Sequence, residues 1–195
     1  MGLILASASP RRRELLEMLG FSDFKVIPAT CDEDSYNLPP ELEVAETARA
    51  KAKDVLARCS DEDMILAADT LVFLDGEKLG KPTDEKDAER MLTRLSGRGH
   101  TVCTGVSILY SGREITKTEV TKVFFREISQ SEILTYVETG EPLDKAGAYG
   151  AQGKGSVFIE RIDGDFFNVM GLPLCLLSNM LGEFGVNILK GSLEK

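Results

Sequence analysis

The chain has 195 residues, of which 23 are Lys or Arg and 32 are Asp or Glu, so its formal net charge is −9 with the single His neutral. This charge argues against a nucleic-acid partner, because proteins held by a phosphate backbone concentrate positive charge over a broad face. The hydrophobic and charged fractions of 43% and 28% are typical of a globular protein. The length suits a single domain over residues 1–195.

Targeting and redox signals favour the cytoplasm without a membrane partner. No apolar run approaches the ~20 residues that span a bilayer, and the start of the chain lacks a cationic leader. The four cysteines are widely separated, which predicts reduced thiols and does not fit a zinc site. Any Ser-His-Asp or Cys-His arrangement would have to use His100, so we expect enzyme chemistry to rest on carboxylates.

In the N-terminal half, strand-like and helix-like segments alternate. Residues 3–6 predict a strand, and Ser9 as N-cap with Pro10 at the first helical position opens a helix that Gly20 ends. We then expect a strand at 24–28, a helix at about 40–56, a strand at 64–74 and a hairpin turn at Asp75-Gly76.

The C-terminal half continues this alternation but adds hairpins. Thr83 is predicted to cap a helix that Ser96-Gly97 stops, and Ser129 with Glu132 forms a capping box that opens another. Strands are predicted at 102–110, 115–125 and 156–162, and a last helix at 172–181. Because hairpins interrupt the alternation, we expect an α/β fold with a mixed, twisted sheet flanked by helices.

Three arginines at 11–13 occupy the opening turn of the first predicted helix. Cations at a helix N-terminus cost about 0.3–1 kcal/mol each unless an anion is bound there. Ser7 and Ser9 add hydroxyl donors, and this combination suits phosphate oxygens. Solvated arginines paired with Glu14 and Glu17 explain the pattern equally well.

Asp69 and Lys51 are charged residues at positions where apolar ones are expected. Asp69 lies within the run 64–74, where a buried carboxylate costs several kcal/mol unless it is paired or bound to metal. A function is therefore favoured over local backbone bonding. Lys51 shares a helical stripe with Val44 and Ala48, and this periodicity favours a snorkelling lysine over one with a phosphate or carboxylate partner.

Two loops carry groups suited to a nucleotide. Asp32, Glu33 and Asp34 offer hard oxygens of the kind that Mg²⁺ selects, although charge runs are usually solvated. The glycine-rich loop at 144–155 allows close approach to a ligand, and its Gln152 offers an amide donor and acceptor that suit the edge of a base.

Six motifs occur in order over almost the whole chain: Ser7-Ala8-Ser9-Pro10-Arg11-Arg12, Ala68-Asp69-Thr70, Gly80-Lys81-Pro82, Leu95-Ser96-Gly97, Asp144-Lys145-Ala146-Gly147-Ala148-Tyr149-Gly150 and Gly171-Leu172-Pro173. This set resembles the Maf family of nucleoside triphosphate pyrophosphatases. The resemblance implies a cleft between two lobes and hydrolysis of a nucleoside triphosphate to the monophosphate and pyrophosphate. It also implies a divalent metal, Mg²⁺ or Mn²⁺, and, because members of the family often form dimers, it leaves a homodimer as a possible assembly.

The resemblance assigns roles residue by residue. Asp69 matches the catalytic carboxylate, with Glu33 as its acidic partner in metal binding. The positions matching the family's triphosphate-binding residues are Ser7, Arg12, Lys51 and Lys81. The positions linked to base choice are Arg11, Thr70 and Gln152.

The glycine-rich loop resembles the branch acting on dTTP and UTP rather than the branch acting on 7-methyl-GTP. Ala151 stands where Ile is more usual, and Phe167-Asn168 where Tyr-Ser is common. These departures leave the preference among pyrimidines open.

The residues alone leave Asp69 two roles, as general base or as metal ligand for the water that attacks the α-phosphorus. A phosphatase of the haloacid dehalogenase type would need an Asp-x-Asp-x-Thr pattern, but Thr70 follows Asp69 directly. A nucleotide-binding regulator of cell division is the alternative outside enzymes, and it would not need Asp69.

Overall fold

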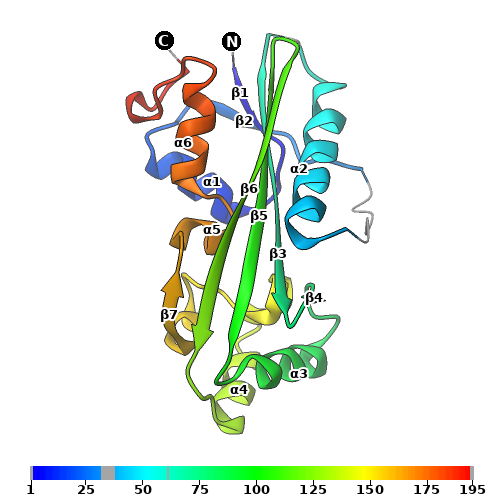
Figure 1. The fold of residues 1–195 in the computed structure, drawn as a ribbon, viewed down its shortest axis with the longest axis vertical. Helices are drawn as coiled ribbons and strands as arrows, with labels where there is room; N and C mark the ends of the chain where they lie inside the picture. Colours follow the sequence, from blue (N-terminus) through cyan, green and yellow to red (C-terminus); the bar gives the residue numbers. More distant parts are fainter. Residues whose placement is uncertain (1, 32–37, 61, 194–195) are drawn as a thin grey trace. The chain divides into compact units, whose positions relative to one another are not determined.

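The computed structural model describes residues 2–31, 38–60 and 62–193. The chain divides into two compact units. Unit 1 comprises Met1–Asp69, Thr104–Glu119 and Gly171–Lys195, and unit 2 comprises Thr70–Cys103 and Val120–Met170. The strand order is β2 (Phe24–Val26), β1 (Leu3–Leu5), β3 (Met64–Leu74), β5 (Gly99–Tyr110), β6 (Arg113–Phe125) and β7 (Ile159–Asp163), and β4 (Glu77–Leu79) pairs with β3. This mixed sheet with its helices confirms the predicted α/β class (Figure 1).

Unit 1 is built on parallel strands. β1 (Leu3–Leu5) pairs in parallel with β2 (Phe24–Val26) and with the first half of β3 (Met64–Leu74). Helix α2 (Pro40–Leu56) packs on one face of these strands in a core cluster that includes Ile4, Ala6, Ala52, Val55, Ile65 and Ala67. Helices α1 (Pro10–Met18) and α6 (Leu174–Gly182) lie on the other side (Figure 1). The alternation of side chains along a strand explains this division.

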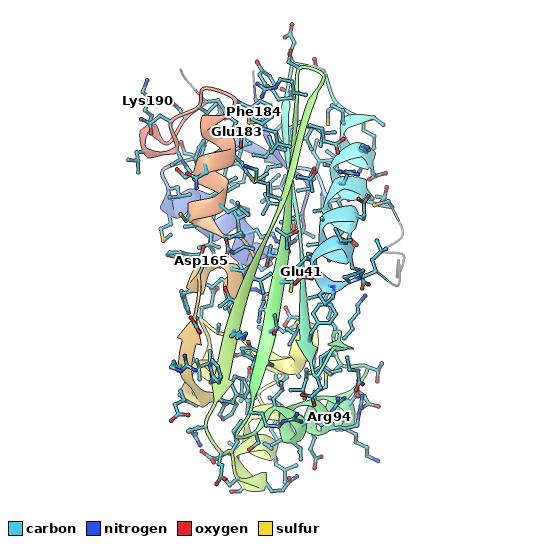
Figure 2. All side chains as sticks on the ribbon, viewed as in Figure 1. Glu41, Arg94, Asp165, Glu183, Phe184 and Lys190 are labelled. Atoms are coloured by element: carbon cyan, nitrogen blue, oxygen red, sulfur yellow. The ribbon has the colours of Figure 1, made fainter. Side chains whose placement is uncertain are left out.

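Helix α2 approaches strand β5 (Gly99–Tyr110) so closely that only glycine fits at Gly105. A Cβ at this position would lie 2.2 Å from the carbonyl oxygen of Val44. The residues that follow α6 contact β6 (Arg113–Phe125). Lys117 pairs with Glu183 at 2.6 Å, and the guanidinium of Arg113 stacks over the ring of Phe184. Glu183 and Phe184 are labelled in Figure 2. The first contact holds α2, which carries Lys51, close to the sheet, and the other two join the segment after α6 to β6.

Unit 2 contains the β3–β4 hairpin, with β4 at Glu77–Leu79, and α3 (Glu85–Leu95). It continues with α4 (Gln130–Val137), three short 3₁₀ helices (Glu141–Asp144, Ala146–Ala148 and Lys154–Phe158), β7 (Ile159–Asp163) and α5 (Phe166–Met170). The stripe predicted for α3 is buried: Ala88, Met91, Leu92 and Leu95. It joins α4 and the aromatic rings of the unit in one core.

Most predicted elements are confirmed, including the bounds 40–56 and 64–74 and the capping box of Ser129 with Glu132. The predicted N-cap of α3 was wrong, because the side chain of Asp84, rather than that of Thr83, accepts a hydrogen bond from the amide of Asp87. Ser9 holds the N-cap position of α1, but its side chain makes no capping bond.

Three further differences lie near the C-terminus. The strand predicted at 156–162 begins later, because a 3₁₀ helix occupies Lys154–Phe158. The last helix begins at Leu174, after Pro173 in extended backbone, and α5 was not predicted. No helix in the described part of the chain has the length and apolar character needed to cross a bilayer.

Candidate active site

Ser7 and Asp69 lie just beyond the stretch over which β1 and β3 pair in unit 1, at the edge of the sheet formed by the carboxyl end of β1, while β3 itself continues to Leu74. Leu5 of β1 pairs with Leu66 of β3, and the amide of Ala6 donates to the Leu66 carbonyl at 2.8 Å. Ser7 leaves the sheet just beyond this bond, and Asp69 follows three residues after Leu66. In α/β folds this edge is where ligands usually bind.

Arg12 is buried and held in a fixed orientation. Its Nε donates to the carbonyl of Gly171 at 2.8 Å, and its Nη1 donates to Oγ of Ser7 at 3.0 Å. The arginines at 11–13 therefore differ in role: Arg13 pairs with Glu17 at 2.8 Å on the surface, as the solvated interpretation predicts, whereas Arg12 does not. A guanidinium oriented in this way presents its fork to an anion at little entropic cost.

Lys51 of α2 and Asp69 of β3 form a buried ion pair. Nζ of Lys51 lies 2.7 Å from Oδ1 of Asp69, and the two residues are 9% and 7% exposed. The snorkelling interpretation of Lys51 was therefore wrong, since the amine points inward to a carboxylate. The pair explains how both charges are accommodated among apolar neighbours, because each offsets the desolvation cost of the other.

The donor chemistry in unit 1 suits a divalent cation only if the substrate contributes ligands. No cluster of three or more His, Cys, Asp or Glu side chains that suits a metal occurs within the described ranges. Glu33, the predicted partner of Asp69 in metal binding, lies outside the described residues. Mg²⁺ is commonly bound by one or two carboxylates with phosphate oxygens and water completing the shell. A single buried carboxylate such as Asp69 fits that mode.

Unit 2 gathers a second group of predicted residues. Thr70 is half-buried on β3, and Lys81 is exposed in the turn after β4. The amide of Gly147 donates to the Gly80 carbonyl at 3.1 Å, so the turn bearing Lys81 is tied to the glycine-rich loop. Gln152 is exposed in the same loop. The structure thus brings the turn that carries Lys81 and the loop that carries Gln152 together in one region of unit 2.

Sequence reasoning missed three residues that shape these groups. The carbonyl of Gly171 anchors Arg12, and its only signal was the Gly-Leu-Pro motif. Glu141 and Tyr136 hold the glycine-rich loop through hydrogen bonds. Burial would raise the pKa of Glu141, but hydrogen bonds from Lys154, Gly155 and Tyr136 and the charge of Lys145 lower it below the usual value.

Comparison with known proteins identifies the family. The model of the Maf family, described as Maf-like protein, matches residues 2–184. The chain belongs to this family, which confirms the resemblance inferred from the six motifs.

Three relatives are named dTTP/UTP pyrophosphatase. The relative from Bdellovibrio bacteriovorus is 49% identical, and the match covers 93% of this chain and 98% of that protein. The relative from Moorella thermoacetica is 50% identical, and the match covers 95% of this chain and 96% of that protein. The relative from Thermococcus onnurineus is 48% identical, and the match covers 96% of this chain and 100% of that protein.

Two solved structures share the fold at low sequence identity. The Ham1 protein of Staphylococcus aureus matches with a TM-score of 0.52 at 14% identity, covering 94% of this chain and 100% of that chain. A HAM1 protein from Coxiella burnetii matches with a TM-score of 0.50 at 15% identity, covering 94% and 99%. At these identities the likeness supports the fold and carries no further argument.

Proposed function

We propose that this chain hydrolyses nucleoside triphosphates, with dTTP and UTP preferred, to the monophosphate and pyrophosphate. The observation that carries the proposal is the buried Asp69–Lys51 pair in the unit that also holds the anchored Arg12. Support comes from relatives that are about half identical and bear the name dTTP/UTP pyrophosphatase.

A triphosphate resists hydrolysis because its negative oxygens repel a nucleophile, so the residues must first neutralise charge. Arg12 binds phosphate oxygens through its guanidinium, Ser7 donates through its hydroxyl, and Lys51 and Lys81 supply ammonium groups. When bound, a divalent cation, Mg²⁺ or Mn²⁺, neutralises phosphate oxygens and favours hydroxide formation, with Asp69 and Glu33 as its protein ligands.

Asp69 takes the central role in the reaction. Water bonds to the α-phosphorus while the bond from that phosphorus to the oxygen bridging it to the β-phosphate breaks, and pyrophosphate leaves. As general base, Asp69 accepts the proton that the water loses; Lys51 holds the carboxylate in place through its 2.7 Å contact. In the alternative role of metal ligand, Asp69 would hold the divalent cation through a carboxylate oxygen, and the proton of the attacking water would pass to solvent.

Base choice is assigned to Arg11, Thr70 and Gln152. The amide of Gln152 offers both a donor and an acceptor, which matches the polar edge of a pyrimidine. A site that hydrogen-bonds a base rejects bases that leave its polar groups unpaired. Ala151 and the Phe167-Asn168 pair leave the order of preference among pyrimidines to be measured.

The test is product analysis with an Asp69→Asn variant. Wild-type protein should release pyrophosphate and the monophosphate as first products, and Asp69→Asn should lose turnover by about a hundredfold or more while still binding nucleotide. Asp23→Asn is the matched control, because Asp23 is an exposed carboxylate in the same unit. Calorimetric titration measures nucleotide binding in each variant.

Three results would contradict this assignment. Orthophosphate as the first product would favour a phosphatase. Equal turnover in wild type and Asp69→Asn would place the chemistry elsewhere, and nucleotide binding without turnover in either protein would favour a regulator. The cytoplasmic location, the homodimer and the lack of a nucleic-acid partner stay predictions.

A further inference from the structure

Glu141 is the hub of a hydrogen-bond network beneath the glycine-rich loop of unit 2. Its Oε1 accepts from the hydroxyl of Tyr136 at 2.9 Å and from the amide of Gly155 at 3.2 Å. Its Oε2 accepts from the amide of Lys154 at 3.0 Å. One carboxylate therefore satisfies two successive backbone donors and a phenol.

Tyr136 extends the network to the other end of the loop. Its hydroxyl oxygen accepts from the buried amide of Gly150 at 3.1 Å while its proton is donated to Glu141. Gly150 and Lys154 lie two residues before and after Gln152. The pair of Glu141 and Tyr136 thus ties both flanks of the segment that carries Gln152.

The loop is also shaped around this carboxylate by contact. A Cβ at Gly153 would lie 2.4 Å from Oε1 of Glu141, and one at Gly150 would lie 2.9 Å from the same atom. A Cβ at Gly155 would lie 2.7 Å from the hydroxyl of Tyr136. Glycine at these three positions lets the backbone wrap closely around the two side chains, at the cost of greater flexibility in the unfolded chain.

The backbone on both sides of Gln152 is held by hydrogen bonds, whereas the side chain of Gln152 itself is exposed. Gly150 and Gly155 are buried, whereas the side chain of Gln152 between them is exposed. A residue that reads a base by hydrogen bonds must present its donor and acceptor at a defined position, and supporting bonds to its backbone provide that definition. Glu141 and Tyr136 supply such bonds to the backbone on both sides of Gln152.

We propose that Glu141, together with Tyr136, is a positioning residue for base selection: its carboxylate fixes the 150–155 segment and thereby the place of Gln152. The inference rests on the proposed role of Gln152 in base choice. It assigns Glu141 an effect on selectivity among bases that exceeds its effect on turnover of the best substrate.

The experiment compares Glu141→Gln and Tyr136→Phe with wild type. Glu141→Gln keeps the shape but places an amide NH₂ toward backbone N–H donors, and Tyr136→Phe removes only the hydroxyl. Glu138→Gln is the matched control, since Glu138 is exposed at the end of α4. The measurements are kcat and KM for dTTP, UTP, CTP and GTP.

We expect the ratio of kcat/KM for dTTP to that for CTP or GTP to fall by about ten- to a hundredfold in Glu141→Gln. The fall should come mainly from a raised KM for dTTP, with kcat changed less. Tyr136→Phe should show the same direction with a smaller effect, and Glu138→Gln should match wild type.

A double substitution separates positioning from general loop stability. If Glu141 acts through Gln152, Glu141→Gln should cause no further loss of selectivity in a Gln152→Ala background. Additive losses would overturn the proposal. So would unchanged selectivity in both Glu141→Gln and Tyr136→Phe.

The outcomes also distinguish this inference from the proposed function. Unchanged base preference in Gln152→Ala alone would refute the base-choice assignment and the inference with it. A large effect of Gln152→Ala with none from Glu141→Gln and Tyr136→Phe would refute only the inference. If circular dichroism shows that Glu141→Gln does not fold, Tyr136→Phe, alone and with Gln152→Ala, decides the question.

Discussion

His100 is a buried, neutral histidine in the core of unit 2. Its ring is 3% exposed and packs edge-to-face against Phe125 and Tyr149, and its Nε2 lies 2.8 Å from the hydroxyl of Tyr149. Its Nδ1 has no hydrogen-bond partner within the described part of the chain. Burial lowers its pKa from 6.5 to about 4, because a charged ring would lose its hydration without gaining an opposite charge.

Protonation of His100 should therefore destabilise the folded protein in mild acid. The unfolded chain binds this proton near the ordinary pKa of 6.5 and the folded protein only near 4, so the unfolded state binds more protons between these values. The contribution of neutral His100 to the free energy of unfolding is fully present above pH 6.5 and is lost as the pH falls from 6.5 to about 4. The loss is about 3 kcal/mol at most.

Urea unfolding of wild type and His100→Gln across this pH range tests the prediction. Glutamine can still hydrogen-bond to Tyr149 but does not titrate, so its stability should depend less steeply on pH. Carboxylates with lowered pKa values, such as Asp54 and Asp87, contribute equally to both proteins and cancel in the comparison. Parallel pH curves for the two proteins would show that His100 is not the group responsible.

For single residues, the sequence predicted which charged side chains of the candidate site are buried better than it predicted which residues they contact. The apolar run around Asp69 revealed a costly buried carboxylate, because burial follows from neighbours along the strand. Its partner Lys51 is 18 positions away on a helix, and periodicity showed only that it faces inward. Glu141 gave no signal, since its role depends on backbone amides at 154 and 155 that a folded loop brings to it.

At the scale of elements, helix α2 approaches strand β5 closely at Gly105. A Cβ at Gly105 would lie 2.2 Å from the Val44 oxygen and 2.4 Å from its carbonyl carbon. Both atoms belong to helix backbone and cannot rotate away. The same helix carries Lys51, whose amine contacts Asp69.

Gly105→Ala should therefore lower the free energy of unfolding by about 3 kcal/mol or more, as overpacked cores do. The matched control is Gly182→Ala at the end of α6, where a Cβ meets nothing within 4 Å. That change should leave the unfolding midpoint in urea almost unchanged. A Gly105→Ala protein as stable as wild type would show that α2 can move away from β5 without cost.

Helices and strands with strong periodicity were predictable, and short or irregular ones were not. The stripe of α3 and the long runs of α2 and β3 fix their elements locally. Helix α5 and the 3₁₀ helices have only a few residues each, so tertiary contacts decide their conformation. The prediction of the N-cap of α3 failed because Thr and Asp are both favourable N-cap residues. Only the hydrogen bond from the amide of Asp87 to the side chain of Asp84 shows which of the two caps the helix.

For the whole molecule, the class of fold was predictable and the family resemblance implied two lobes, but the boundaries between the two units were not predictable. Boundaries between units usually fall in exposed linkers rich in Pro, Gly or polar residues. Here three of them fall inside strands: β3 between Asp69 and Thr70, β5 between Cys103 and Thr104, and β6 between Glu119 and Val120. Each of these strands continues through its boundary without a turn, so the sequence contains no linker that marks the division.

Because β3, β5 and β6 each continue from one unit into the other, we predict that the two units unfold together as a single domain. Native-state hydrogen exchange measures this directly, since the most protected amides of each unit report its opening free energy. Amides in β3 near Ile65 and in α3 near Leu92 should show the same value. Gly105→Ala, which acts in unit 1, should lower both values equally, because a two-state chain loses protection everywhere at once. Loss of protection confined to unit 1 would show instead that unit 2 folds independently.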